Sequence, residues 1–570
     1  MFKTYTRPEF SYSRDTDQDA EDVVHHQVIV VGAGPSGMAT AIGLAQQGIA
    51  VVLLDSSNTV STGSRAVCYS QRSLDIADRL GIGQRLVEKG TSWSFGRTFF
   101  GDTEVDSFNL TDTDSRHPAF VNLQQYYLEE YLIDRIGELS AISLRWENRV
   151  VRIDHSNELT LLKIDTPEGS YQLSCDYLIA GDGANSFIRS ESHQDFKGQI
   201  FHNRFLIADV VMETDKFPVE RWLWFNPAFH DGQTALIQPQ ADNVWRIDFD
   251  IGWQADPAEE RKPENVIARV EALLGGDVSF ELEWASVYTF TCRRMDRFRK
   301  ANLFFVGDAA HQVSPFSARG INSGFEDADN LVWKLRLVID GLASDSLLDS
   351  YSDERCYAAD RNMQLSTNAT DFITPKAGQC RVFRDAVLDL AKDYDFARTL
   401  VNSGRLSEAV FIEESPLNTS DADHFDCDVL PGAPCADGPV LYQGKDTFLR
   451  SVLGISFTGL LFVDQEDEAS RVVAQLDAQL AELAELAVPV KTYIIAPHGM
   501  ELALPEGGKV IVDHRAVVRQ RLDAKAGTFY LCRPDQLIAA RMRRFDMPAV
   551  LAAHSRALGN YQEYEENDNG

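Results

Sequence analysis

The sequence predicts an α/β protein with a Rossmann-like nucleotide-binding domain that is interrupted by an antiparallel sheet and followed by another α/β domain. Two short apolar segments with a glycine-rich turn and a helical pattern between them predict the first fold. Alternating segments at about 200–300 predict the inserted sheet, and apolar strand-like segments after residue 440 predict the last domain.

Length and composition are those of a large globular protein. The chain has 570 residues, 44% of them hydrophobic and 25% charged, which supplies enough apolar surface for extensive cores and excludes general disorder. A formal charge of −32 argues against nucleic acid as a partner. The apolar runs are strand-sized, so we expect no membrane span.

Residues 1–26 form a polar, acidic N-terminal tail without the apolar segment of a signal peptide. The eight cysteines are scattered without a C-x-x-C pair, which argues against a disulfide scaffold, a zinc ribbon and a dithiol redox centre. We expect reduced thiols in a cytoplasmic protein. The twelve histidines show no metal-ligand spacing, so no metal site is predicted.

The first βαβ unit lies directly after this tail. His25–Val31 is a β-branched run typical of a strand buried on both faces, Gly37–Gln47 has helical spacing, and Ala50–Leu54 is a second buried strand. Between the first strand and the helix lies a G-x-G-x-x-G motif, Gly32-Ala33-Gly34-Pro35-Ser36-Gly37. Its glycines permit a tight turn and let the helix N-terminus bind a pyrophosphate. Asp55, at the tip of the second strand, is expected to accept hydrogen bonds from an adenosine ribose.

A second motif indicates that the nucleotide is a flavin. After the inserted sheet, Leu303–Val306 is again a buried strand, and Asp308 at its end can hold the hydroxyls of a ribityl chain. A long helix is predicted from about Asn322 to Gly341. The backbone N–H groups of Gly320, Ile321 and Asn322 at its start would face the pyrimidine edge of the flavin and favour the reduced anion.

A third motif, Tyr177–Arg189, contains a buried strand that ends in Asp182-Gly183. No second G-x-G-x-x-G follows, so a pyridine nucleotide would have no Rossmann fold of its own.

The remaining chain predicts a linker and a separate domain. Residues 406–440 are rich in Ser, Asp, Pro and Gly. In the domain at 441–560, strands are expected at Gly459–Val463, Val490–Ile495 and Lys509–Val512, with a helix near Ala469–Leu486. Residues 561–570 form an acidic tail, for which we expect disorder.

The three motifs, in this order, resemble the single-component flavoprotein aromatic hydroxylases of the para-hydroxybenzoate and phenol hydroxylase family, over residues 27–405. The resemblance implies an FAD-binding domain whose inserted sheet binds substrate. It also implies that Asp182 and its motif serve both FAD and NADH or NADPH. Ala526–Gln536 resembles the closing part of the thioredoxin-like domain of phenol-hydroxylase-type members, and without C-x-x-C we expect it to be structural.

The family roles carry over to matching positions. They imply pyrophosphate contact for Gly34 and Ser36, ribose contact for Asp55, ribityl contact for Asp308 and ring contact for Gly320, Ile321 and Asn322. Arg65 matches the family arginine near the pyrophosphate, and Gln125 matches the helix residue beside the flavin chain. Where the family has Gly-Gly-Gln-Gly, this chain has Ser317-Ala318-Arg319-Gly320, which brings an additional cation near the ring.

The expected reaction is hydroxylation of an activated, phenolic ring. The resemblance implies that NAD(P)H reduces FAD, that O2 forms a flavin C4a-hydroperoxide, and that the terminal oxygen passes to the aromatic substrate. The candidates for substrate binding or catalysis are Arg246, His311 and Tyr288, each of which has a purely structural alternative. For Arg246 that alternative is a solvent-facing pair with Asp248. A homodimer is the expected assembly.

Other functions stay open from the sequence. Trp222-Leu223-Trp224-Phe225-Asn226-Pro227 is similar to the W-x-W-x-I-P stretch of flavin-dependent halogenases, with Asn226 at the Ile position. An FAD-linked dehydrogenase or oxidase is a second alternative, and a flavin-bound interaction module without turnover is a third.

Overall fold

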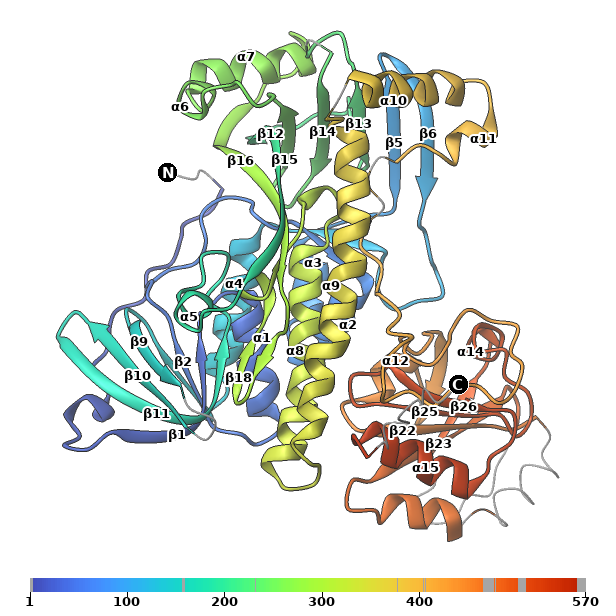
Figure 1. Ribbon diagram of the computed structural model, residues 1–570. Coiled ribbons are helices and arrows are strands. Elements are labelled where there is room, and N and C mark those ends of the chain that lie inside the picture. Colours follow the sequence, from blue (N-terminus) through green and yellow to red (C-terminus); the bar gives the residue numbers. More distant parts are fainter. Residues whose placement is uncertain are drawn as a thin grey trace, which may run out of the picture. The chain divides into compact units, whose positions relative to one another are not determined.

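The computed structural model consists of two compact units, which are described separately (Figure 1). The first unit comprises Met1–Asp112, His117–Ala328 and Ala359–Glu408, and the second comprises Thr113–Arg116, Asp329–Ala358 and Ala409–Gly570. The structure describes residues 4–155, 159–230, 232–376, 378–402, 404, 406–464, 476, 478–500 and 509–560. No helix in these ranges has the length and apolarity that a bilayer crossing requires.

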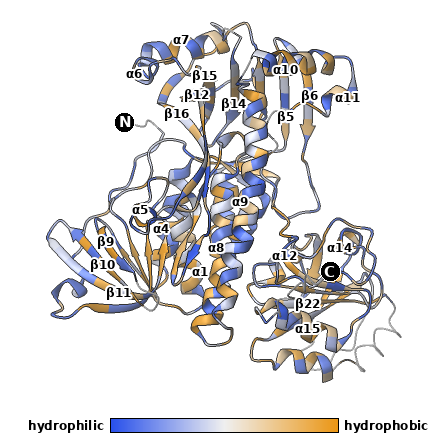
Figure 2. Cartoon of the chain, viewed as in Figure 1, coloured by the Kyte–Doolittle hydropathy of each residue, from blue (hydrophilic) through white to orange (hydrophobic). Residues whose placement is uncertain are grey.

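The first unit is built on a mixed sheet in the order β17-β18-β11-β1-β2-β8, with β10 and β9 continuing from β11. The bounds are β1 Val24–Val31, β2 Val51–Leu54, β8 Ile142–Arg145, β9 Arg149–His155, β10 Thr160–Thr166, β11 Gly169–Ala180, β17 Arg299–Lys300 and β18 Leu303–Phe305. The strands from β18 to β8 run parallel, and hydrophobic residues dominate them (Figure 2). Because both faces of such a sheet are covered, β-branched runs without alternation form its centre.

The first βαβ unit has the predicted order of strand, helix and strand. The second half of β1 and all of β2 are buried, and α1 (Pro35–Gln46) connects them. Observed strand and helix bounds differ by only a residue or two from those expected here. The predicted strand at 303–306 is β18, and the long helix begins at Gly320, two residues before its expected start, as α8 (Gly320–Ile339).

The inserted sheet is larger than the predicted segment 200–300. Its order is β19-β16-β12-β15-β14-β13-β5-β6, with β5 Phe95–Phe100, β6 Thr103–Asn109, β12 Phe196–Val211, β13 Arg221–Phe225, β14 Thr234–Pro239, β15 Val244–Asp250, β16 Glu281–Met295 and β19 His311–Gln312. β5 pairs in parallel with β13, although more than 120 residues separate them. β5 and β6 form a local hairpin, but the pairing of β5 with β13 leaves no local pattern in the sequence, which therefore does not place this hairpin in the inserted sheet.

The two faces of this sheet differ. One face carries an apolar cluster that includes Leu206, Trp224, Ile237 and Phe249, and α7 (Pro263–Leu274) covers it. The opposite face has an apolar end around Phe225 and a polar end that contains charged side chains of β13 and β15.

Short elements complete the first unit. They are η1 Thr16–Asp19, β3 Cys68–Ser70, α2 Gln71–Leu80, α3 Gly83–Lys89, β4 Thr91–Trp93, β7 Phe120–Asn122, α4 Gln125–Gly137, α5 Phe187–Glu191, α6 Pro257–Glu260, η2 Gly307–Ala309, η3 Pro315–Ser317, α10 Gly378–Ala391 and α11 Asp395–Arg398. The tail expected at 1–26 is partly packed, because Tyr5 is buried and stacks on Tyr126 with ring centroids 4.0 Å apart.

The second unit contains a sheet in the order β21-β20-β24-β23-β22-β25-β26. Its elements are β20 Pro439–Tyr442, β21 Lys445–Phe448, α12 Leu449–Leu453, β22 Phe457–Phe462, β23 Val490–Pro497, β24 Val510–Asp513, α14 Val517–Arg521, β25 Phe529–Cys532, β26 Ile538–Met542 and α15 Met547–Ala557. The three predicted strands correspond to β22, β23 and β24. Of the helix predicted at 469–486, residues 478–484 are helical, whereas residues 469–475 and 477 and the acidic tail at 561–570 lie outside the described residues.

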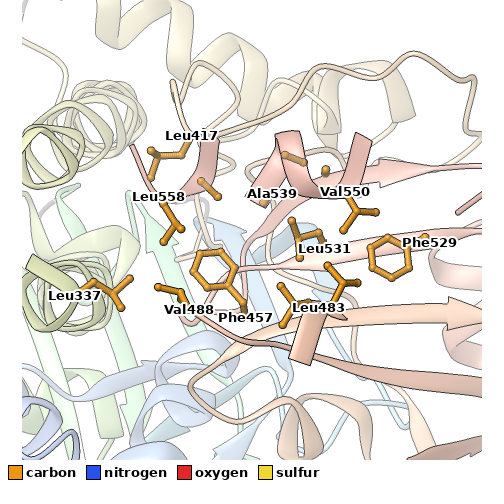
Figure 3. Close-up of a cluster of buried hydrophobic side chains, with 14 of the residues drawn as sticks. Leu337, Leu417, Phe457, Leu483, Val488, Phe529, Leu531, Ala539, Val550 and Leu558 are labelled. Carbon is orange, nitrogen blue, oxygen red and sulfur yellow. The ribbon is translucent and has the colours of Figure 1, made fainter. Parts of the chain in front are cut away.

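The segment expected to be a linker contributes to the core of the second unit. Leu417 is completely buried, and Figure 3 shows it in the same cluster as Phe457 of β22, Leu531 of β25, Val550 of α15 and Leu337 of α8. The Pro- and Gly-rich composition correctly indicates irregular backbone before β20. It does not distinguish an exposed connection from one that packs against a sheet.

A completely buried ionic cluster holds the second unit together. The Glu354 carboxylate, on α9 (Ser346–Ile373), accepts from Arg533 at 2.5 and 3.0 Å, from Lys334 at 2.7 Å and from Asn330 at 2.7 Å. Asp535 accepts from the Arg533 Nε at 3.1 Å and from the Trp333 indole at 3.1 Å. Burial alone would raise the pKa of Glu354, but Arg533 and Lys334 outweigh it and hold that pKa well below its ordinary range.

We predict that Glu354→Gln lowers the free energy of unfolding of the second unit by about 3–5 kcal/mol, because two buried cations lose a charged partner. The stabilisation by Glu354 is fully present above its unfolded pKa of about 4.5 and is lost as the pH falls below that value. Urea unfolding should therefore show a difference from wild type at pH 7 that shrinks on acidification. The exposed Glu482→Gln is the control, and a loss no larger than the control's would contradict this account.

Candidate active site

The glycine-rich turn of the first motif has two packed glycines and one open glycine. A Cβ on Gly32 would overlap the Gly181 carbonyl, and a Cβ on Gly37 would overlap the Gly32 carbonyl. Gly32 also has a φ of +102°, which favours glycine. A Cβ on Gly34, the N-cap of α1, would meet nothing within 4 Å. The turn therefore leaves open space at the N-terminus of a twelve-residue helix, where anions bind favourably.

The first and second motifs are in direct contact. The Ser36 side chain lies against Gly307 and Gly324, at a distance that leaves no room for a Cβ at either glycine. Gly307 precedes Asp308 in η2, and Gly324 lies on α8. The two segments that we expected to hold opposite parts of one ligand are thus side by side, about 270 residues apart in the chain.

One cavity of about 660 Å³ in the first unit connects both motifs with the inserted sheet. Of the predicted site residues, those lining it are Gly34, Ser36, Arg65, Gln125, Arg246, Tyr288, Asp308, Gly320 and Ile321. The others, which do not line it, are Gly32, Gly37, Asp55, Asp182, His311 and Asn322.

Asp308 is the carboxylate best placed for a ligand. Its side chain is exposed, lines the cavity and has no hydrogen-bond partner among the described residues. The dense protein around it desolvates the carboxyl and raises its pKa, while His311, Arg65 and Arg189 act in the opposite direction.

The loop at 61–66 is held by α4. Gln125 accepts a hydrogen bond from the Ala66 N–H at 3.1 Å and donates to Glu129 at 2.7 Å, and Glu129 accepts from the Ser61 N–H at 2.5 Å. Arg65, between these anchors, is exposed and lines the cavity. Gln125 therefore positions the loop that presents Arg65.

Asp55 and Asp182 have structural partners. Asp55 accepts from the Ala33 N–H at 2.6 Å and the Ser57 N–H at 2.7 Å, which fixes the glycine-rich turn on β2. Asp182 accepts from the Ile188 N–H at 3.0 Å at the start of α5. Burial raises the pKa of both carboxyls. Their contacts to a nucleotide stay predictions.

Two further candidates, His311 and Asn322, stabilise the second motif through hydrogen bonds to neighbouring segments. His311 is buried and pairs with Asp327 at 2.7 Å, and Asp327 also accepts from the Gly307 N–H at 2.9 Å. Asn322 accepts from the Ser70 N–H at 3.0 Å and donates to the Cys68 carbonyl at 3.1 Å. The side chain of His311 points from β19 toward α8, so it is not brought to the cavity with Arg246 and Tyr288.

Arg246 is part of the sheet face that borders the cavity. Its Nε donates to both oxygens of Asp248, at 3.1 and 3.2 Å, and its Nη1 donates to the carbonyls of Ser64 and Arg65. The expected pair with Asp248 exists, but both residues are buried, so the solvent-facing alternative is wrong. The reason is that the loop at 61–66 covers this end of the sheet.

A neighbouring carboxylate holds the same loop. Asp209 of β12 lies opposite Arg246 and accepts from the Ser64 hydroxyl at 2.7 Å. Complete burial raises its pKa to about 6, with Arg246 and Ser64 acting in the opposite direction.

Sequence reasoning missed Arg221, Gln238 and the inward position of Asp248, all of which line the cavity. Arg221 opens β13, where Leu223 and Phe225 share one cluster and Trp222 and Trp224 pack in the cluster on the other face. The alternation Arg-Trp-Leu-Trp-Phe was visible, and it places Arg221 on the same face as two core residues. The two tryptophans of the halogenase-like stretch do not line the cavity.

The additional cation of the second motif also reaches the cavity. Arg319 is buried and donates to the Asn362 amide oxygen at 2.8 Å and to the Leu406 carbonyl at 2.9 Å. Burial lowers its pKa. Arg319 thus ties the start of α8 to the segment around Leu406.

The residues present fit a dinucleotide that carries a ribityl chain. The open space at Gly34 suits a pyrophosphate, Asp308 offers an unused carboxylate, and Gly320 and Ile321 bring backbone at the start of α8 to the cavity wall. Among the described residues, no three His, Cys, Asp or Glu side chains gather as a metal site would require.

Comparisons with known proteins show the family. The family model described as "FAD binding domain" matches residues 25–366. A 6-methylpretetramide 4-monooxygenase of Streptomyces rimosus is 27% identical over 551 residues, 93% of each chain. A 3-(3-hydroxy-phenyl)propionate/3-hydroxycinnamic acid hydroxylase of Escherichia coli O139:H28 is 28% identical over 376 residues, 65% of this chain and 66% of that protein.

Solved structures share the fold. The flavin-dependent monooxygenase PieE, in complex with FAD and substrate, superposes with a TM-score of 0.77 at 19% identity. Aklavinone-11 hydroxylase with FAD and aklavinone gives a TM-score of 0.73 at 19% identity. Both comparisons cover 94% of this chain and all of the other.

We predict that Gly34→Ala and Gly37→Ala separate ligand binding from folding. A methyl at Gly34 meets no protein atom, so the free energy of unfolding of the FAD-free protein should change by less than about 0.5 kcal/mol. The methyl occupies the expected pyrophosphate space, so the Kd for FAD should rise more than about tenfold, or about 1.4 kcal/mol. Gly37→Ala should instead destabilise the fold by about 1–3 kcal/mol.

Thermal unfolding of the FAD-free proteins and titration with FAD, followed by quenching of its fluorescence, measure the two effects. If the Gly34→Ala protein binds FAD with the same Kd as wild type, no phosphate of FAD approaches this turn.

Proposed function

The chain belongs to the family described as FAD binding domain and is a flavoprotein monooxygenase, and from this premise we propose that it hydroxylates a phenolic aromatic compound. One observation carries the proposal. A single cavity is lined both by Gly34, Ser36 and Asp308 and by the polar face of the inserted sheet. A cofactor and a substrate can therefore be in contact inside the same cavity.

We assign cofactor positions as follows. Gly34 and Ser36 hold the pyrophosphate, Asp308 holds the ribityl hydroxyls, and the backbone at Gly320 and Ile321 faces the ring. Bound FAD would supply the redox chemistry, with NADH or NADPH as reductant and a C4a-hydroperoxide as oxygen donor to the substrate. The protein's own contribution is to position the substrate and exclude water.

The substrate end requires orientation and proton control. Tyr288 of β16 lines the cavity and offers a hydroxyl that can donate to or accept from a phenol. Arg246 orients the loop at 61–66 and Asp248, and His311 supports the turn before Asp308 through Asp327. We therefore propose Tyr288 as the substrate contact of the three original candidates, and Arg246 and His311 as positioning residues.

A fused-ring phenol is the substrate size that we propose. The 6-methylpretetramide 4-monooxygenase aligns with 93% of this chain, whereas the hydroxyphenylpropionate hydroxylase aligns with 65%. A cavity of about 660 Å³ lies within the range of small-molecule sites that enclose drug-sized ligands.

Two smaller proposals concern the rest of the chain. The sheet of the second unit, with parallel β22, β23 and β24 flanked by antiparallel β25 and β26, supports a thioredoxin-like domain with a structural role. None of the eight cysteines forms a disulfide in the structure, which supports the proposed cytoplasmic location.

We propose a homodimer through α10 and α11. This helix pair exposes a set of large apolar side chains, namely Val382, Phe383, Leu390, Tyr394, Phe396 and Leu400. Residues 378–400 carry four basic and four acidic side chains, so the surface is neutral in a chain of charge −32. Two copies of an acidic chain repel each other electrostatically, and this repulsion is smallest where the contact surface is neutral and apolar.

The function is tested with Asp308→Ala, which we expect to purify colourless because the ribityl chain loses its carboxylate partner. The exposed Asp102→Ala in the β5–β6 turn is the control and should remain yellow. Absorbance at flavin wavelengths against protein concentration measures the cofactor content. An Asp308→Ala protein with full FAD content would count against the assigned site.

Turnover is tested on wild type with single-ring phenols, hydroxybenzoates, hydroxyphenylpropionates and fused-ring phenols. We expect substrate-stimulated NAD(P)H consumption and incorporation of labelled dioxygen into product, highest for fused rings. Oxidation without labelled oxygen in the product would indicate a dehydrogenase or oxidase. Product formation only with added reduced flavin and halide would indicate a halogenase. Tight FAD without turnover would indicate an interaction module.

The dimer is tested by light scattering after size-exclusion chromatography. We expect wild type to be dimeric at micromolar concentration and Phe383→Glu/Phe396→Glu to be monomeric, because two charges enter the apolar contact. Val219→Glu, at another exposed apolar residue, should remain dimeric. A monomeric wild type would refute the proposal.

A further inference from the structure

The charged side chains that line the cavity have a formal excess of one positive charge in an acidic protein. The charged side chains that line it are four arginines, Arg65, Arg221, Arg246 and Arg319, and three carboxylates, Glu129, Asp248 and Asp308. The chain as a whole has a formal charge of −32. Cations concentrated in a cleft of low dielectric attract anionic ligands even when the surface repels them.

The two arginines of the inserted sheet are paired very differently. Arg246 donates to Asp248 and to two carbonyls, which occupies most of its N–H groups. Arg221 is 4% exposed, and its one hydrogen bond to a described residue runs from Nη2 to the Phe316 carbonyl at 3.3 Å. A guanidinium has five N–H donors, so most of the N–H donors of Arg221 are available to a ligand in the cavity.

Among the described residues, no carboxylate is hydrogen-bonded to Arg221. Burial raises the pKa of the nearby Cys68 thiol to about 12, so Cys68 is neutral. Asp248 attracts Arg221 electrostatically, but its carboxylate is hydrogen-bonded to Arg246. Desolvation lowers the pKa of Arg221 to about 10, which leaves it charged at neutral pH. A buried cation without a partner costs stability, so its retention requires an explanation.

We propose that Arg221 is the binding site for an anionic oxygen of the aromatic substrate, such as a carboxylate, phenolate or enolate. The planar fork suits two oxygens of one carboxylate or of adjacent oxygen substituents. This inference rests on the proposed function, because it takes the bound anion to be the aromatic substrate. It concerns the binding of that substrate and not its turnover. It assigns the specificity of the cavity to a residue of β13 and not to Arg246.

The test uses two probes of equal shape, 3-hydroxy-2-naphthoate and its carboxamide. Their fluorescence is titrated with the FAD-loaded protein in the absence of NAD(P)H, so no turnover occurs. We expect wild type to bind the carboxylate at least tenfold more tightly than the carboxamide. In Arg221→Gln the Kd for the carboxylate should rise about 10- to 100-fold, the size of a charge-assisted hydrogen bond, with the carboxamide changing less than threefold.

Variants separate this role from a structural one. Arg221→Lys keeps the charge and should retain part of the preference for the carboxylate, and the exposed Arg381→Gln should match wild type. FAD content and melting temperature should not fall in Arg221→Gln, since an unbalanced buried cation does not stabilise the ligand-free fold. If Arg221→Gln fails to fold, Arg221→Lys decides: a preference for the carboxylate that is weaker than in wild type supports the anion site, and an unchanged preference overturns it.

Other outcomes are decisive as well. Equal affinity of wild type for both probes, or an equal loss for both in Arg221→Gln, overturns the proposal. If the phenol panel gives no oxygenated product while the carboxylate preference depends on Arg221, the proposed function fails and the anion site stands. If hydroxylation occurs and Arg221→Gln discriminates the probes as wild type does, the anion site fails and the proposed function stands.

Discussion

The close packing of Ser36 between Gly307 and Gly324 is the contact on which the site depends. It joins the turn before α1 to the turn after β18 with no space for any other side chain. A larger residue at either glycine would overlap the Ser36 side chain and force the two turns apart. Everything assigned to one ligand, from Gly34 to Ile321, presupposes that these two turns touch.

Local patterns predicted the parts of the fold that depend on neighbours in sequence. The buried strands β1, β2 and β18, the glycine-rich turn and α8 all follow from runs of at most twenty residues. What was missed depends on distant partners. The parallel pairing of β5 with β13, the core position of Leu417 and the pairing of His311 with Asp327 each involve residues whose partners no spacing rule identifies. Strand alternation indicates the face of Arg221, but that this face borders the cavity depends on the distant segments that complete the cavity wall.

Buried charge serves two purposes in this protein. In the second unit, Glu354, Lys334, Arg533 and Asp535 balance one another and each has hydrogen-bond partners, as a structural cluster must. On the inserted sheet, Asp248 balances Arg246 and leaves Arg221 unbalanced. The difference lies in the count of partners and not in the depth of burial, since all of these side chains are largely inaccessible to solvent. The number of charged and hydrogen-bonding partners of a buried ionic side chain therefore distinguishes side chains that stabilise the fold from side chains that are available to bind a ligand.

The split topology has a consequence for synthesis on the ribosome. β1 is among the first elements to emerge, yet β18, which completes the parallel sheet beside β11, follows about 270 residues later. At typical elongation rates of about 5–20 residues per second, the nascent sheet would remain incomplete for about 15–55 s. During that time the exposed edge of β11 and the apolar interior of the half-formed layer would require protection, which makes chaperone dependence and slow maturation expected properties of heterologous expression.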